Sequence, residues 1–348
     1  MDVARVMAPR ADADELRQLR DAIRGVIAPS EDGTAIDAIG WRDRWQSLAA
    51  LDAVALCVPE ARSGYGLATE AAIAVAQELG AALHGSPYAG LLASAHALAA
   101  GGDTAEPQLS DLVHGRSVIA FGELSVVAPE LELAAPRGIA RLVDGAQTAD
   151  AFLLAVPASR ELLLIDAQSC RVEPPSLQFD ETRLCGDVVL EGEPAKTIAT
   201  DHIAPELFRL LLAADALGGV QRMLERTVQY AADRYAFGRP IGGFQAVQHR
   251  LVDHTVRVRG MQLVVTEAAR ALAEDPDNAA RAVTLAELGV SVGAVHVLHD
   301  LLQLTGAIGF TWEYGLHRYE RRAHHDARLV GNPRAAQRAL AALEGWTK

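Results

Sequence analysis

The sequence has few aromatic residues and few cysteines. Aromatic residues make up only 5% of the 348 residues, although 50% of the chain is hydrophobic. Ala, Leu and Val therefore supply most of the apolar content, which favours closely packed helices and argues against an all-β or disordered chain. The three cysteines, Cys57, Cys170 and Cys185, form no CxxC pair and no metal-binding spacing. We expect reduced, mostly buried thiols and a cytoplasmic protein.

Long hydrophobic runs are also missing. The first twenty residues have no apolar core like that of a signal peptide, so we expect no export. No apolar run reaches the roughly 20 residues that span a bilayer. Ser94 and His96 interrupt the Ala-Leu segment from Ala89 to Ala100, which we interpret as a buried helix. We therefore expect no membrane partner.

Positive charge is in deficit. The chain has 32 Lys and Arg residues against 45 Asp and Glu residues, which gives a formal net charge of −13. A phosphate backbone selects a basic surface, so this balance argues against nucleic acid as a partner.

The apolar residues follow a helical period, then short strand-like runs, then a helical period again. Leu16, Leu19, Ile23 and Ile27 lie on one face of a helix predicted between residues 12 and 27, and residues 41–51 repeat the pattern. After Gly115 the runs are short and separated by Gly, Pro and Asp, which is typical of strands. The helical period returns after residue 201. We predict an α+β fold with an N-terminal helical domain (1–110), a small β domain (111–199) and a C-terminal helical bundle (200–348), with linkers at 103–110 and 191–201.

The stretch RYAFGRPIGGFQAVQHR, residues 234–250, is the most informative in the chain. Three glycines and Pro240 lie here between two strongly helical segments. Glycine allows backbone conformations that other residues avoid, and proline prevents a helix from continuing. The stretch therefore predicts a tight break between helices that faces a ligand.

Four blocks together resemble the acyl-CoA dehydrogenase family of flavoproteins. They are VPEARSGYGL (58–67), GAQTADAFLLAV (145–156), RYAFGRPIGGFQAVQHRLVD (234–253) and QLTGAIGFTWEYGLHRYERRA (303–323). Each block alone has an ordinary explanation as a turn, a helix end or a close-packing site, but their order and spacing are specific together. The resemblance covers most of the chain.

The resemblance implies FAD at a subunit interface, where one chain completes its neighbour's site. Arg234 is placed near the pyrophosphate, where a guanidinium can bind phosphate oxygens in a forked geometry. The other implied cofactor-binding residues are Phe237, Gly238, Gln303, Gly306 and Ala307. The part of the family pattern that serves a neighbour's flavin is therefore largely kept.

The part of the family's sequence pattern that holds a chain's own flavin ring is altered. The family places an aromatic residue against the flavin and a threonine hydroxyl near its N5 atom, in positions that here hold Leu142 and Asp144. An aspartate there would oppose the build-up of negative charge on the reduced ring.

The usual catalytic glutamate is missing as well. Removing an α-proton from an acyl thioester requires a carboxylate with a raised pKa. The two positions that supply it in the family appear here as Gly331 and Phe208, so we assign no catalytic residue. Glu206 lies two residues from Phe208, on another face of the helix.

Three functional hypotheses follow. The leading one is a subunit of a heteromeric, FAD-dependent acyl-CoA dehydrogenase that lacks its own base and completes the site of a catalytic partner; it is most like the partner subunits of steroid side-chain enzymes. The second is a homomeric enzyme with a relocated base, Glu206 or Glu313. The third is a scaffold subunit without flavin.

Other polar groups carry weaker signals. His296 and His299 are three residues apart on a helix, but nothing completes a metal site. Residues 324–326, His-His-Asp, are interpreted as a polar helix end. We expect Glu313 and Glu320 to form ion pairs with neighbouring arginines.

Overall fold

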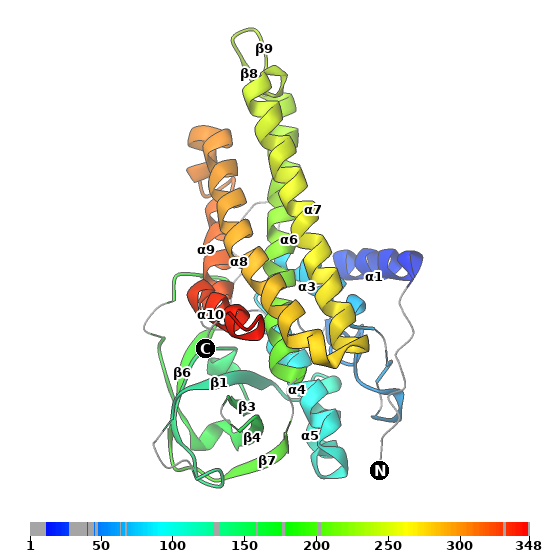
Figure 1. Ribbon diagram of the computed structural model, residues 1–348, viewed down its shortest axis with the longest axis vertical. Coiled ribbons are helices and arrows are strands. Elements are labelled where there is room, and N and C mark those ends of the chain that lie inside the picture. The colour runs from blue at the N-terminus through cyan, green and yellow to red at the C-terminus, as the bar shows by residue number, and fades with distance from the viewer. Residues whose placement is uncertain are drawn as a thin grey trace.

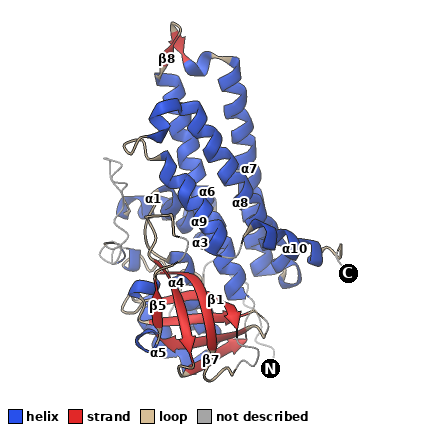
Figure 2. Cartoon of the chain, turned by 90° about the vertical axis from the view of Figure 1, so that its left-hand side faces the viewer, coloured by secondary structure: helices blue, strands red, loops and turns tan. Residues whose placement is uncertain are grey.

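The fold is helical at both ends of the chain and contains a sheet between them. The computed structural model describes residues 12–27, 40, 45, 48–62, 64–66, 68–127, 132–157, 159–175, 178–200, 203–329 and 332–346. The sheet lies at one end of the molecule, and long helices run from it to a small hairpin at the opposite end (Figures 1 and 2). The predicted α+β class is confirmed, with helices, strands and helices in that order.

The N-terminal helices are α1 (Ala13–Val26), α3 (Thr69–Ala81), α4 (Tyr88–Ala100) and α5 (Glu106–Val113). Asp12 begins α1 with a capping box, in which its side chain accepts hydrogen bonds from two backbone N–H groups of the first turn. The predicted linker at 103–110 is wrong, because a 3-10 turn and α5 fill it. Pro107 lies in the first turn of α5, where the missing N–H costs no helical bond. The helix predicted at 41–51 falls largely outside the described residues.

The sheet has seven strands. They are β1 (Ile119–Val127), β2 (Arg137–Asp144), β3 (Ala151–Val156), β4 (Glu161–Asp166), β5 (Arg171–Glu173), β6 (Cys185–Glu191) and β7 (Ala195–Thr200). Their order is β5-β6-β2-β1-β3-β4-β7, with β1 and β3 parallel and the other pairs antiparallel. The linker predicted at 191–201 is wrong, because β7 pairs with β4 there.

Strand β3 lies between two hydrophobic cores. Leu153 and Ala155 belong to the large core shared with the helices, whereas Phe152, Leu154 and Val156 belong to a smaller core of sheet residues. Successive side chains of a strand point to opposite faces, so a strand covered on both faces reads as one continuous apolar run. The sheet is thereby fixed against the helices.

The C-terminal part is a bundle of long helices. Its elements are α6 (Ile203–Asp233), β8 (Tyr235–Ala236), β9 (Arg239–Pro240), α7 (Gln245–Glu274), α8 (Pro276–Thr305), the 3-10 turn η6 (Gly306–Phe310), α9 (Leu316–Leu329) and α10 (Pro333–Leu343). Helix α6 is central and contacts α3, α4, α7, α8 and α9. Figure 1 shows the β8–β9 hairpin beyond its outer end.

Two glycines let α3 and α6 cross closely. A Cβ atom on Gly80 would lie 1.9 Å from the backbone oxygen of Asp215, and one on Gly218 would lie 1.9 Å from the backbone oxygen of Gln77. Neither position can carry a side chain without separating the helices. This contact fixes Asp215 in the protein interior.

Helix α8 is apolar enough to be compared with a membrane span. Residues Pro276–Phe310 have the length and composition of one, but half of their most apolar stretch is buried inside the protein. The helix contacts α6, α7 and α9. Its composition is therefore that of a core helix of the bundle.

Candidate cofactor site

The hairpin after α6 carries three of the predicted site residues. Arg234, Phe237 and Gly238 are exposed, and the Phe237 side chain is 96% exposed. Phe237 and Gly238 both have positive φ angles, 53° and 80°, at the two central positions of the β8–β9 turn. Such a turn suits glycine, but an aromatic residue there is strained, and strain of this kind concentrates at functional sites.

The end of α8 carries the other three. Gln303, Gly306 and Ala307 are exposed, and Gly306 ends the helix with a φ of 67°. Tyr314, shortly after η6, lies against the Tyr230 ring of α6 at 6.1 Å and under the Arg226 guanidinium at 4.7 Å.

All six predicted residues are therefore exposed, three of them in the β8–β9 hairpin and three at the end of α8 and in the turn after it. Figure 1 shows the hairpin at the end of the bundle that lies away from the sheet. This arrangement leaves an arginine and several backbone groups turned outward.

Asp144, at the end of β2, is only 3% exposed and belongs to a buried ion cluster. Arg183, before β6, donates hydrogen bonds to Asp144 Oδ2 at 2.6 Å, to Asp326 Oδ1 at 2.9 Å and to Asp215 Oδ1 at 3.2 Å. Arg322 donates to both oxygens of Asp215, at 2.7 and 2.9 Å. We call these five side chains the buried ion cluster; they join the sheet to α6 and α9.

The cluster also reaches the N-terminal helices. Arg322 donates to the backbone oxygen of His84, between α3 and α4, at 2.9 Å and to the Thr182 hydroxyl at 2.9 Å. The helices at both ends of the chain and the sheet thus meet at one set of buried charges.

The cluster holds three aspartates and two arginines. Burial raises the pKa of Asp326 well above its ordinary value, and it also raises that of Asp144. Burial opposes the charge of Asp215 too, but Arg322 and Arg183 hold its pKa below its ordinary value. Two guanidinium groups thus share three carboxylates, and burial opposes the charge of each carboxylate.

Asp144, which the family resemblance assigns to the surroundings of the flavin ring, offers no hydroxyl group there. The family uses a hydroxyl there, whereas Asp144 is an acceptor already bound by Arg183. A group that displaced Arg183 from Oδ2 of Asp144 would leave this carboxylate unpaired in the interior.

The family resemblance assigns the base to two positions, which are Phe208 and Gly331 in this sequence. Phe208 is 3% exposed, and its ring lies 5.2 Å from that of Phe121 in the core. Gly331 lies outside the described residues. Glu206 lines a cavity at the start of α6, where burial raises its pKa to about 7.

The Glu206 cavity has a volume of about 470 Å³ and lies between the sheet, the start of α6 and the turn from α7 to α8. Arg209 donates to Glu206 Oε2 at 2.9 Å and to Glu287 Oε2 at 2.8 Å.

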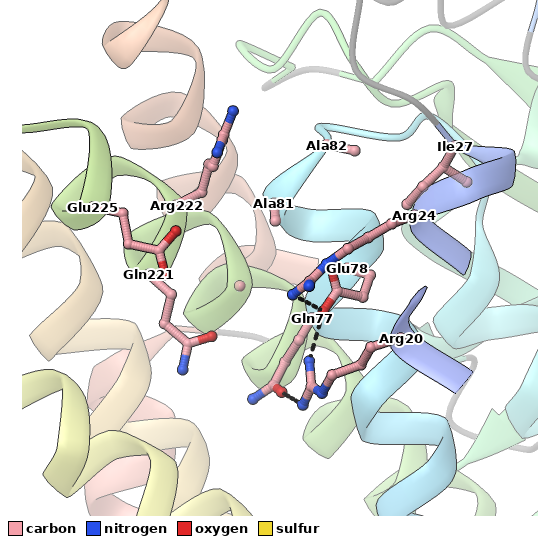
Figure 3. Close-up of a pocket in the computed structure, with 11 residues that line it drawn as sticks. Arg20, Arg24, Ile27, Gln77, Glu78, Ala81, Ala82, Gln221, Arg222 and Glu225 are labelled. Atoms are coloured by element: carbon pink, nitrogen blue, oxygen red, sulfur yellow. Dashed lines mark hydrogen bonds and ion pairs between the residues drawn. The ribbon is translucent and has the colours of Figure 1, made fainter. Parts of the chain in front are cut away.

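A second cavity, of about 440 Å³, lies between α1, α3 and α6. Figure 3 shows Arg20 and Arg24 of α1 reaching Glu78 of α3, with Gln221 and Arg222 of α6 on the opposite side. Both arginines bind Glu78, at 2.8 and 2.7 Å, so its charge is already matched.

Two sequence expectations about polar groups need revision. Residues 324–326 are not a polar helix end, because His325 and Asp326 are buried. The arginines near Glu320 bind distant partners instead: Arg318 binds Glu181 at 2.9 Å and Arg322 binds Asp215. Glu320 lies 3.3 Å from His299.

His325 also contacts Cys185. Its Nε2 atom lies 3.2 Å from Cys185 Sγ. Burial raises the pKa of Cys185 well above its ordinary value and lowers that of His325 to about 4. The pair is therefore neutral at pH 7, and the thiol is no nucleophile.

Sequence reasoning missed the buried ion cluster. One signal could have indicated it: Asp215 is a single charge in the apolar run LLLAADALGGV, residues 210–220. A buried charge requires a partner. Nothing local to Arg183 or Arg322 identifies them as that partner.

Comparison with known proteins identifies the family. The sequence profile described as acyl-CoA dehydrogenase, C-terminal domain, matches residues 205–340. The acyl-CoA dehydrogenase IpdE2 of Mycobacterium tuberculosis is 32% identical over 334 residues, which cover 94% of this chain and 96% of that protein. The chain therefore belongs to the acyl-CoA dehydrogenase family.

Solved structures share its fold. The ChsE4-ChsE5 complex from Mycobacterium tuberculosis matches with a TM-score of 0.82 and 24% identity, covering 97% of this chain and 99% of the other. The Tcur3481-Tcur3483 steroid ACAD matches with a TM-score of 0.80 and 23% identity, covering 96% and 98%. At these identities the likeness establishes the fold.

Proposed function

We propose that this chain is the flavin-incomplete subunit of a heteromeric acyl-CoA dehydrogenase. In this role it completes the FAD site of a catalytic partner, and the complex introduces an α,β double bond into an acyl-CoA thioester. Arg234, Phe237 and Gly238, together with Gln303, Gly306 and Ala307, contact the ADP half of the partner's FAD.

One observation carries the proposal: Arg183 holds Asp144 inside the buried ion cluster, and the family resemblance assigns the position of Asp144 to the surroundings of the flavin ring. A ring at that position would meet a carboxylate that opposes its reduction. The chain is therefore suited to contribute to a flavin held elsewhere.

The exposed residues at the outer end support the proposed contact with the partner's FAD. A guanidinium turned outward can reach a phosphate on another chain, and the open backbone at Gly306 allows close approach of an anionic group. Family members with the same fold include complexes of two differently named chains, ChsE4-ChsE5 and Tcur3481-Tcur3483, and the second is described as a steroid enzyme. We propose a steroid-derived acyl-CoA as the substrate class of the complex.

The test is to express the chain alone and with candidate partner chains, and to measure the flavin-to-protein ratio of each preparation. We expect no stoichiometric FAD in the chain alone and bound FAD in the complex. Stoichiometric FAD together with acyl-CoA oxidation by the chain alone would overturn the proposal.

The variant Arg234→Ala separates this role from that of a scaffold. In the complex it should lower the FAD content because it removes a phosphate contact. An unchanged FAD content would instead support a scaffold that stabilises the partner without touching its cofactor.

One observation favours a second candidate function, a homomeric enzyme with a relocated base. Glu206 has a pKa of about 7 and lines a cavity of ligand size. This candidate requires that the chain alone oxidises an acyl-CoA and that Glu206→Gln abolishes the activity while the FAD content stays the same.

A further inference from the structure

The Glu206 cavity combines apolar walls with a group of carboxylates. Its volume of about 470 Å³ lies within the range of roughly 300–1,000 Å³ that is typical of small-molecule sites. The apolar lining comes from the sheet, from the start of α6, from the turn between α7 and α8, and from α10; it includes Ala155, Val156, Ile203, Leu272, Ala279 and Leu343. Glu123 of β1 and Glu206 of α6 supply carboxylates to the same space.

Arg209 is hydrogen-bonded to two glutamates near this cavity and lies close enough to a third, Glu123, to act on its charge. Arg209 binds Glu206 and Glu287, at 2.9 and 2.8 Å, and the Thr284 hydroxyl at 3.3 Å. Glu123 lines the cavity without a hydrogen bond or ion pair to any residue that the structure describes. Three carboxylates therefore lie near one guanidinium: burial raises the pKa of Glu123, Glu206 and Glu287, and the charge of Arg209 lowers it.

The number of arginines per carboxylate distinguishes the Glu206 cavity from the one between α1, α3 and α6. There, Glu78 is matched by Arg20 and Arg24. Here, the lining itself holds three carboxylates, Glu123, Glu206 and Asp277, and one guanidinium, Arg160.

We propose that the Glu206 cavity binds a primary ammonium group carried on a short apolar chain. The ammonium group would lie between Glu123 and Glu206 and offer three N–H donors to their oxygens, while the apolar chain would contact the walls. A metal ion suits the site less well, because no group of three His, Cys, Asp or Glu side chains in the described ranges is placed to hold one. The inference is independent of the proposed role in a flavoprotein complex.

The protonation of Glu206 couples this binding to pH. Its pKa is about 7: burial is the largest cause of the rise, the carboxylates of Glu123 and Glu287 add to it, and Arg209 acts against it. An ammonium group favours the ionised form, so binding releases a proton near pH 7. Affinity should rise as the pH increases from 6 to 8.

The experiment is isothermal titration calorimetry of the full chain with hexan-1-amine, using hexan-1-ol as the uncharged probe of the same length. We expect saturable binding of the amine that strengthens roughly tenfold between pH 6 and pH 8. Hexan-1-ol should bind at least tenfold more weakly, because it carries no charge.

The variants Glu206→Gln and Glu123→Gln keep the shape of the side chain and remove its charge. Each should weaken amine binding at pH 8 by about tenfold or more, and circular dichroism would verify that each variant is folded. Glu225→Gln, on the exposed side of the other cavity, is the matched control and should bind like the unaltered chain.

Failure of the chain to bind millimolar hexan-1-amine would overturn the inference. Equal binding of the alcohol, or unaltered amine affinity in both glutamine variants, would do the same.

Discussion

Arg183→Met tests the buried ion cluster directly. Methionine fills a similar volume but removes the cation that binds Asp144, Asp215 and Asp326. Asp215 keeps Arg322, whereas Asp144 loses its guanidinium partner.

The expected loss in the free energy of unfolding follows from the unpaired carboxylate of Asp144. Breaking a buried pair by removing one partner costs about 3–5 kcal/mol, because an uncompensated charge stays in the interior. An exposed pair such as Arg171 with Glu191 contributes about 0–1 kcal/mol, and its side chains are 55% and 65% exposed. We therefore expect Arg183→Met to lower the free energy of unfolding several times more than Arg171→Met.

Urea denaturation followed by circular dichroism measures both variants under the same conditions. A second substitution, Asp144→Asn in the Arg183→Met chain, removes the stranded charge and should recover part of the loss. Equal stability of the Arg183→Met and Arg171→Met chains would refute the reasoning, and so would a double variant no more stable than Arg183→Met alone.

Three further predictions test other parts of the molecule. Gly218→Ala should lower the free energy of unfolding in urea by about 1–3 kcal/mol, because its Cβ atom would lie 1.9 Å from a backbone oxygen. Gly260→Ala, whose Cβ atom would have nothing within 4 Å, should instead raise the free energy of unfolding by about 0.5–1 kcal/mol. Glu206 has a pKa of about 7 against an ordinary 4.5, so its contribution to stability falls as the pH rises through this window, by up to about 3 kcal/mol. Unfolding measured from pH 5 to 8 should therefore show Glu206→Gln gaining on the unaltered chain with rising pH, and a constant difference would contradict this. Phe237→Ala should leave stability unchanged, since the side chain is 96% exposed, but should lower the FAD content of the complex; an equal FAD content would exclude a role for the ring.

Local patterns in the sequence were enough to predict the order of elements. The spacing of Leu16, Leu19 and Ile23 predicted α1, and the short apolar runs after Gly115 predicted strands, because each pattern reflects burial of one element. The linkers were wrong because Pro107 and Pro194 were interpreted as breaks. Pro107 instead lies in the first turn of α5, and Pro194 directly precedes β7.

The candidate site, too, was predictable from the sequence only in part. The exposed segments around Arg234 and Gly306 are continuous in sequence, so their motifs could be recognised. The buried ion cluster draws Asp144, Arg183, Asp215 and Asp326 from four separate elements, and only the tertiary fold brings them together. A residue such as Asp326 therefore resembled a surface charge until its surroundings were known.

The length of helix α6 separates the Glu206 cavity from the β8–β9 hairpin. Its 31 residues, at about 1.5 Å each, extend roughly 45 Å from the Glu206 end to the hairpin. Residues so far apart share no neighbours, so substitutions at one end should leave the other unaffected. The effects of a substitution at Glu206 and of one in the β8–β9 hairpin should therefore add in a chain that carries both.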